Sequence, residues 1–303
     1  MHEKLKEQLT PVFKLFFELG SDNRKFYEDQ FETIFLQKVA KFYQFTSKKY
    51  LNNACEYVRN IYEFVNAEEK YADKLLDKFL DPMTHPKWKN IIIQKLITTN
   101  IQKVIENKDT GLVFLLKNDC FGEMNLLHCL LKRVPNVTKF NVAPVLNQIE
   151  DHVIKYIRNC WRNDFVKINE FLCSQNFNGY IQSLYELEQK MDSFIKKYFK
   201  VQSELTAKVQ AEILHLLNVD PKLLSLYIDH YLKKGLKNDN ENDRFDILER
   251  AVNVFKYITD KDIFEKYYKQ HLTKRLIFDK SSSNEAEKFV ISRMKMVLIT
   301  LKK

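Results

Sequence analysis

Apolar side chains recur at helical spacing along almost the whole chain. The clearest case is the segment 180–200, where one helical face carries Ile181, Leu184, Leu187, Met191, Phe194 and Ile195. Alternating Val, Ile and Thr runs separated by Asn-Gly or Asp-Gly turns do not occur in the sequence. Only five glycines and six prolines interrupt 303 residues. The pattern therefore predicts an all-α fold made of many helices.

The helices predicted from this period fall into successive groups. The expected ranges are 3–19, 26–51, 56–80, 87–107, 110–118, 123–134, 138–173, 180–200, 203–217, 221–234 and 243–258. The segment 83–90 (MTHPKWKN) is expected to be a loop, and residues 176–179 (NFNG) are expected to interrupt the helical pattern. The segment 22–136 then holds about five helices, and 138–258 again holds about five.

The segment 255–287 has the most distinctive wording in the chain. Phe264, Tyr268, Leu272 and Leu276 repeat every four residues, and Ile263 and Tyr267 widen this apolar stripe. The opposite face is expected to remain in solvent, and it carries Lys266, Lys269, Lys274 and Arg275. Capping boxes are expected at Thr259–Asp262 and at Ser282–Glu285. The prediction is one helix, a short polar joint that includes Ser281–Ser283, and a second helix.

Two segments resemble the signature of the cullins, the scaffold subunits of multi-subunit ubiquitin ligases. They are KDIFEKYYKQHLTKRLI (261–277) and KSSSNEAEKFVISRMK (280–295). Other segments resemble the family as well: YEDQFETIFLQKVAKFY (27–43), TGLVFLLKN (110–118), LLKRVPN (130–136) and LLSLYIDHYLKKGLK (223–237). The last three are most similar to the cullin that takes BTB-domain adaptors. Together the similar segments span most of the chain from about Asp22 to Met294.

The resemblance implies an elongated stack of cullin repeats, each a five-helix bundle. Residues 1–20 would end the first repeat, 22–136 would form the second, 138–258 the third, and 259–303 would begin the carboxy-terminal domain. It also implies a non-catalytic scaffold in cytoplasm and nucleus that links a BTB-type adaptor to a RING-box protein. The signature residues would pack between domains: Phe264, Tyr267, Tyr268, His271, Leu272, Arg275 and Leu276.

After ISRMK (291–295) the sequence departs from the wording of the family. Residues 296–303 read MVLITLKK, where cullins continue to a Cys-Gly and a long globular region. The expectation is that most of the first repeat, the RING-protein cradle and the modifier-acceptor lysine lie outside these 303 residues. Both partner sites would then be largely missing, so the chain alone is expected neither to bind a RING partner nor to support ubiquitin transfer.

Composition leaves one alternative open. The net charge of +9 suggests a helical-repeat module for protein or RNA, but the excess is spread along the chain and solvated helix faces are favoured over nucleic-acid binding. The sequence contains no apolar run long enough to cross a membrane. Five scattered cysteines favour a reducing compartment.

Motifs for catalysis, cofactors or metals are not evident. The sequence has no Gly-rich phosphate loop, HExxH pair or GxSxG elbow. Cys120, His128 and Cys129 could be ligands, but an apolar helix without a fourth ligand favours core packing. Cys173 has no His or acid at a recognisable spacing, and Ser281–Ser283 are interpreted as a helix cap. No catalytic, cofactor-binding or metal-binding residue is therefore predicted, and no cofactor.

Overall fold

The computed structural model describes residues 11, 15, 24–76, 81–135, 141–174, 176–217, 219–235 and 241–301. Every regular element in these ranges is a helix, which confirms the predicted all-α fold class. The predicted helix at 3–19 lies almost entirely outside the described residues.

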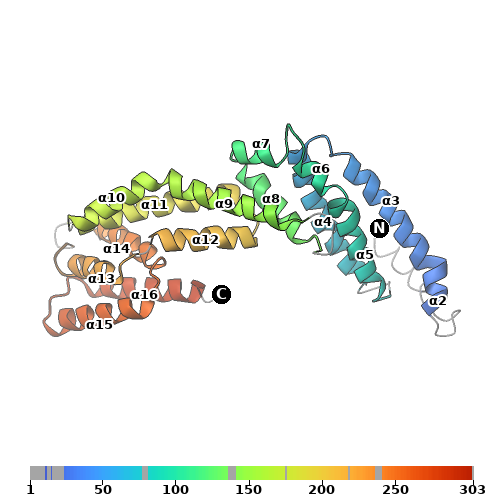
Figure 1. Cartoon of the computed structure of the whole chain (residues 1–303). Helices are drawn as coiled ribbons and strands as arrows, with labels where there is room; N and C mark the ends of the chain where they lie inside the picture. The colour runs from blue at the N-terminus through green and yellow to red at the C-terminus, as the bar shows by residue number, and fades with distance from the viewer. Residues whose placement is uncertain are drawn as a thin grey trace. The chain divides into compact units, whose positions relative to one another are not determined.

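Fifteen α-helices and three π-helical segments follow one another in the described residues. In chain order they are α2 (Arg24–Tyr27), η1 (Glu28–Glu32), α3 (Thr33–Lys48), α4 (Ala54–Leu76), α5 (Thr84–Ile92), η2 (Ile93–Thr98), α6 (Ile101–Ile105), α7 (Leu112–Lys117), α8 (Phe121–Lys132), α9 (Ala143–Cys160), α10 (Arg162–Cys173), α11 (Phe177–Tyr198), α12 (Glu204–Leu217), α13 (Pro221–His230), η3 (Tyr231–Gly235), α14 (Glu241–Phe255), α15 (Lys261–Ile277) and α16 (Asn284–Leu301). Figure 1 labels the α-helices in this order.

The chain folds into two compact units. Unit 1 comprises Met1–His152 and Val201–Leu205, and unit 2 comprises Val153–Lys200 and Thr206–Lys303. Of the three unit boundaries, one falls within α9, one between α11 and α12, and one within α12. The predicted boundaries of the cullin repeats stay predictions.

Unit 1 is built around the contacts of α3, α4 and α5, and the buried aromatic residues Tyr43, Tyr57 and Trp88 form part of its core. The Trp88 indole Nε1 donates a hydrogen bond to the Tyr43 hydroxyl at 2.9 Å. The Tyr57 hydroxyl donates to the backbone carbonyl of Leu96. The polar atoms of these three buried aromatic residues are thus paired, as their burial requires.

The segment 83–90 is not the loop that the sequence suggested. Helix α5 begins at Thr84, and Pro86 lies in its first turn, where the missing N–H costs no intrahelical hydrogen bond. Thr84, Trp88 and Ile92 are buried along one face of this helix. The loop prediction was wrong because Pro86 lies in the first helical turn, a position where helices accept proline.

Unit 1 also buries one carboxylate, Glu32, at the junction of η1 and α5. Its oxygens accept hydrogen bonds from Arg24 at 2.8 Å, Lys87 at 2.7 Å and the Thr84 hydroxyl at 2.7 Å. Arg24 also pairs with Glu28 and, at 3.0 Å, with Asp81. We call Arg24, Glu32, Thr84 and Lys87 the Glu32 cluster.

Unit 2 contains α10 and α11 packed together, α14 against α11, and α16 against α14. The predicted buried face of α11 is confirmed: Ile181, Leu184, Leu187 and Met191 are all buried. Helix α11 begins earlier than expected, at Phe177, because the Asn176 side chain accepts a hydrogen bond from Gly179 N at 3.0 Å. Residues 176–179 therefore start a helix rather than only interrupt one.

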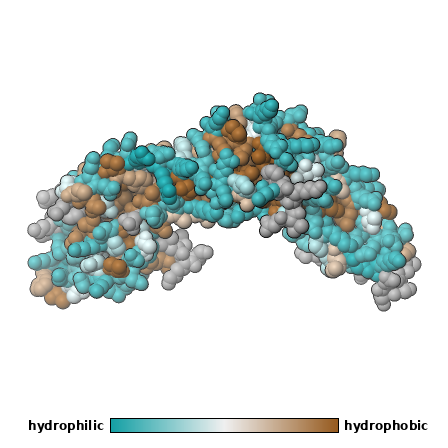
Figure 2. All heavy atoms as spheres, in the orientation of Figure 1, coloured by the Kyte–Doolittle hydropathy of each residue, from teal (hydrophilic) through white to brown (hydrophobic). Residues whose placement is uncertain are grey.

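Helix α13 lies beside α15, and α16 follows α15 after a short joint; both late helices are red in Figure 1. On the face seen in Figure 2, hydrophilic side chains cover most of the surface and apolar ones form smaller patches. This is the surface expected of helices that bury one apolar face each.

Candidate functional site

The candidate site is the neighbourhood of α15, which carries all seven signature residues. Phe264 and Tyr268 are buried, and their rings stack with centroids 5.8 Å apart. Phe264 also contacts Phe255 of α14 at 4.9 Å between ring centroids. Phe264 thus connects the first half of α15 to the end of α14.

The later part of the predicted stripe is not buried. Leu276 is 54% exposed, Ile263 is 47% exposed, and Tyr267 and Leu272 are half-buried. A spacing of four residues advances by about 40° more than one helical turn, so the stripe winds around the helix instead of following one face. The predicted apolar stripe of α15 is therefore only partly buried.

Arg275 is completely buried. The helical pattern predicted it on the solvent face, which was wrong, whereas the family resemblance implied that it packs between domains, which stays a prediction. The distance of 11 residues from Phe264 to Arg275 is about three full turns, so both side chains lie on the same face of α15. That face runs from Phe264 through Tyr268 and His271 to Arg275. The spacing 4-3-4 was the sequence signal that could have identified it.

The guanidinium of Arg275 binds two carboxylates. Its Nε and Nη2 donate to the two oxygens of Glu287 at 2.6 and 2.8 Å, and Nη1 donates to Asp229 Oδ1 at 2.6 Å. Asp229 belongs to α13 and Glu287 to α16, so one side chain of α15 connects three helices. A guanidinium is tolerated in the interior only when it is paired in this way.

Asp229 has further partners. Lys233 Nζ donates to its Oδ2 at 2.6 Å, and His271 Nδ1 lies 3.6 Å from the same oxygen. Burial by itself raises the pKa of Asp229, but hydrogen bonds from Lys233 and Arg275 outweigh burial and lower the pKa below its ordinary value. Burial lowers the pKa of His271, against the opposing attraction of Asp229, and thus favours a neutral imidazole.

Each serine of the joint has a separate partner. Ser281 Oγ donates to Glu287 Oε1 at 2.9 Å, and Ser282 donates from both its amide and its hydroxyl to the Leu232 carbonyl at 2.8 and 2.7 Å. Ser283 caps α16, because its hydroxyl accepts from Ala286 N at 3.3 Å. The capping prediction was therefore displaced by one residue, from Ser282 to Ser283.

The other predicted capping box does not form. The N-cap of α15 is Asp260, whose side chain makes no capping hydrogen bond. The Thr259 carbonyl instead accepts from Lys261 N at 3.2 Å. This end of α15 is thus held by the packing of Phe264 rather than by a side-chain cap.

We call Asp229, Lys233, Arg275, Ser281 and Glu287 the Arg275 cluster. Two positive and two negative charges balance within it, and Arg275 donates from all three of its nitrogens. Asp229, Lys233 and Glu287 were not among the residues predicted from the sequence. An acid inside the apolar run LLSLYIDHYL (223–232) was the available signal. The arrangement holds helices together and offers no activated nucleophile.

The cysteine and histidine candidates lie elsewhere. His128 is buried in α8 of unit 1 and its Nε2 lies 2.9 Å from Glu150 Oε1. Cys173 of unit 2 is exposed. Among the described residues, no group of three or more His, Cys, Asp or Glu side chains is arranged to hold a metal ion.

The fold defines this chain as a helical-repeat protein, and comparison with known proteins gives its family. The family model described as the cullin alpha solenoid domain matches residues 2–298. The chain therefore belongs to the cullin family.

The similar curated proteins include three cullins of type 3. Cullin-3 of Dictyostelium discoideum is 29% identical over 94% of this chain and 36% of its own length. Cullin-3B of Arabidopsis thaliana is 28% identical over 94% of this chain and 37% of its own length. Cullin-3 of Caenorhabditis elegans is 27% identical over 91% of this chain and 35% of its own length. The chain thus spans little more than a third of the relatives that it matches, and its recognition as similar to type-3 cullins is confirmed.

None of the described helices is both long and apolar enough to span a membrane.

Proposed function

We propose that this chain supplies the helical scaffold of a cullin-RING ubiquitin ligase and does no chemistry of its own. The observation that carries the proposal is the match of residues 2–298 to the cullin alpha solenoid model. The packed, all-helical units support it, since a scaffold needs stiff elements rather than an active site.

The mechanism would be mechanical. A BTB-type substrate adaptor and a RING-box protein with its charged conjugating enzyme would be held on one scaffold. A fixed distance between them raises the effective concentration of substrate lysine near the thioester. The similarity to Cullin-3 proteins supports a BTB-type adaptor. Ubiquitin-dependent degradation in cytoplasm and nucleus would be the setting.

A chimera tests this proposal. Residues 2–298 replace the matching segment of Cullin-3 from Dictyostelium discoideum, and ubiquitin transfer is measured with activating enzyme, conjugating enzyme, RING-box protein and a BTB adaptor. We expect transfer well above that of the parent with the segment deleted. A folded chimera that binds both partners but transfers no ubiquitin would contradict a scaffold function.

The alternative, an RNA-binding helical-repeat module, rests on the net charge of +9. Fluorescence anisotropy with single-stranded RNA at low and high salt distinguishes it. RNA binding that weakens steeply with salt would favour the alternative. We expect no such binding.

A further inference from the structure

Helix α16 is held in unit 2 by two different kinds of contact. Its apolar face packs on α14, where the rings of Phe245 and Phe289 meet edge to face with centroids 5.0 Å apart. Ala286, Val290 and Met294 are buried along the same helix. Apolar contacts hold a helix close to its neighbour, but they are non-directional and discriminate weakly among similar angles.

The Arg275 cluster is the directional contact. The two parallel bonds from Arg275 to Glu287 fix both a distance and a plane, since the guanidinium fork is rigid. The third bond, from Nη1 to Asp229 at 2.6 Å, ties this plane to α13. Three helices therefore share one rigid planar group.

The joint between α15 and α16 is fixed from the other side. Ser282 donates twice to the Leu232 carbonyl of η3, and the Lys280 amide donates to the Arg275 carbonyl at 2.9 Å. The Ser281 hydroxyl donates a further hydrogen bond to Glu287. The first turn of α16 is thus attached to α13, η3 and α15 by polar contacts of defined geometry.

A buried ion cluster is a poor source of net stability. Removing two charges from water costs several kcal/mol per ion, and apolar residues of similar volume are often as stabilising or more so. Arg275 has no exposed surface, and Asp229 and Glu287 are almost as buried. The cluster is therefore better explained by the orientation that it imposes than by the stability that it adds.

We propose that Arg275, Asp229 and Glu287 are positioning residues that hold α16 in a single orientation on α13 and α15. The proposal deepens the proposed scaffold function and rests on it, because a scaffold must present what it carries at a fixed angle.

The test measures the distance between α13 and α16 in the full 303-residue chain. Spin labels are attached at Lys222→Cys and Lys295→Cys, two exposed positions on these helices, after the five native cysteines have been replaced. The test variant, Asp229→Asn with Arg275→Met and Glu287→Gln, removes every charge of the three-residue core and leaves no carboxylate there unpaired.

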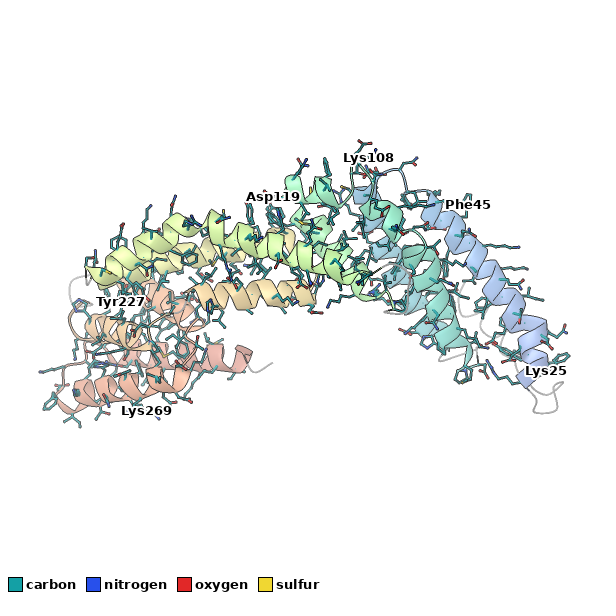
Figure 3. All side chains as sticks on the ribbon, viewed as in Figure 1. Lys25, Phe45, Lys108, Asp119, Tyr227 and Lys269 are labelled. Atoms are coloured by element: carbon teal, nitrogen blue, oxygen red, sulfur yellow. The ribbon has the colours of Figure 1, made fainter. Side chains whose placement is uncertain are left out.

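In this variant we expect the distance distribution to broaden by roughly twofold, with helical content unchanged, because the apolar contact with α14 remains. Lys269→Met is the matched control: it removes a cation from α15 whose side chain is 70% exposed and should leave the width unchanged. Figure 3 labels Lys269 on α15. A distribution as narrow as that of the wild type in a folded triple variant would overturn the proposal.

If the triple variant does not fold, the single variant Arg275→Lys tests the proposal instead. Lysine keeps the charge but loses the planar fork, so we expect a broadened distribution and faster amide exchange in residues 284–287. An unchanged distribution in Arg275→Lys would overturn the proposal as well.

The scaffold function is tested separately in the chimera. With wild-type residues 2–298, transfer should occur; with the triple variant, the maximal transfer rate should fall while the affinity for each partner is unchanged. Equal maximal rates would overturn the positioning role. If even the wild-type chimera is inactive, the proposed function fails, while the distance measurement still decides the orientation of α16.

Discussion

Each unit contains a cluster of polar side chains around a buried charged residue, and the two clusters differ in how far the partners of that residue are exposed to solvent. In unit 1 the buried residue is an acid, Glu32, and its partners Arg24 and Lys87 keep 28% and 44% of their side chains exposed. In unit 2 the central residue of the cluster is a base, Arg275, and the two carboxylates that it binds, Asp229 and Glu287, keep only 10% and 6% of their side chains exposed. The first cluster lies at the surface, and the second lies inside.

This difference determines what each cluster can do. Partners that meet water are partly screened by solvent and salt, and they can be rehydrated when a bond is lost. Partners that are buried cannot be rehydrated without opening the helices around them. The Glu32 cluster should therefore tolerate damage, whereas the Arg275 cluster should act as a unit.

The largest effect is expected from Arg275→Met. The change leaves Asp229 and Glu287 buried without their shared cation, and breaking a buried ion pair in this way costs about 3–5 kcal/mol. Native-state amide exchange of α13 and α16 should report this loss in unit 2. A loss below about 1 kcal/mol would mean that the cluster is effectively a surface cluster.

Lys269→Met is the matched control for this measurement. Lys269 pairs with Glu265 at 2.5 Å on the exposed side of α15, and both side chains are mostly in solvent. Removing it should change the unfolding free energy by less than about 0.5 kcal/mol.

The contrast also explains what sequence alone could provide. Helices such as α11 were predictable because a helical face is a local pattern, visible in consecutive residues such as Ile181, Leu184 and Leu187. The ion pairs of Arg275 were not, since its partners are 46 and 12 residues away in sequence and only the fold brings them together. A basic residue next to Lys274 in the sequence is normally expected to face solvent.

Errors at helix ends had a different cause. Each of the three consecutive serines has a side chain that could cap α16. In the structure the Ser282 hydroxyl donates to the Leu232 carbonyl instead, and Ser283 is the cap. The family, by contrast, was predictable from the wording of 261–277 and 280–295, which the match to residues 2–298 bears out. A local sequence pattern does not reveal partners that are distant in sequence, but it can reveal the family.

The second prediction concerns Glu32→Gln. The amide can still accept from Arg24 or Lys87, and both cations can turn toward water, so we expect a loss of about 1–2 kcal/mol in unit 1. Amide exchange of α5, which carries Thr84 and Lys87, measures it. A loss equal to that of Arg275→Met would remove the proposed difference between the two clusters.

Salt sharpens this comparison. At about 1 M salt, charges more than about 3 Å apart are screened where solvent reaches them. The cost of Glu32→Gln should then decrease, and the cost of Arg275→Met should not. Equal salt dependence would show that both clusters are equally accessible to solvent.

The third prediction concerns the order in which the two units lose stability as the pH falls. Burial by itself raises the pKa of Glu32, but hydrogen bonds from Lys87 and Thr84 and the charge of Arg24 outweigh it and lower the pKa below its ordinary 4.5. The pKa of Asp229 is likewise below its ordinary 3.8. A carboxylate whose pKa is lowered by folding stabilises the fold above its ordinary pKa, and this contribution is lost as pH falls through the folded value.

Unit 1 should therefore begin to lose stability below about pH 4.5 and unit 2 below about pH 3.8, if these carboxylates dominate. Amide exchange or tryptophan fluorescence (Trp88 in unit 1, Trp161 in unit 2) can follow the two units separately. Glu32→Gln should flatten the acid dependence of unit 1, and Asp229→Asn should flatten that of unit 2. Acid profiles that neither substitution changes would assign the effect to other carboxylates.

Among the substitutions within the two clusters, the smallest effect is expected from Ser281→Ala, which tests whether the Arg275 cluster depends equally on each of its members. The hydroxyl donates one hydrogen bond to Glu287 Oε1 at 2.9 Å, while Arg275 holds both oxygens of the same carboxylate. Because Glu287 keeps its charged partner, we expect a loss of only about 0.5–1.5 kcal/mol, visible as faster amide exchange in residues 284–287. Ser292→Ala is the control, since that exposed hydroxyl donates only to the Phe289 carbonyl of its own helix. A loss for Ser281→Ala as large as that for Arg275→Met would mean that the hydroxyl, and not the guanidinium fork, holds Glu287 in place.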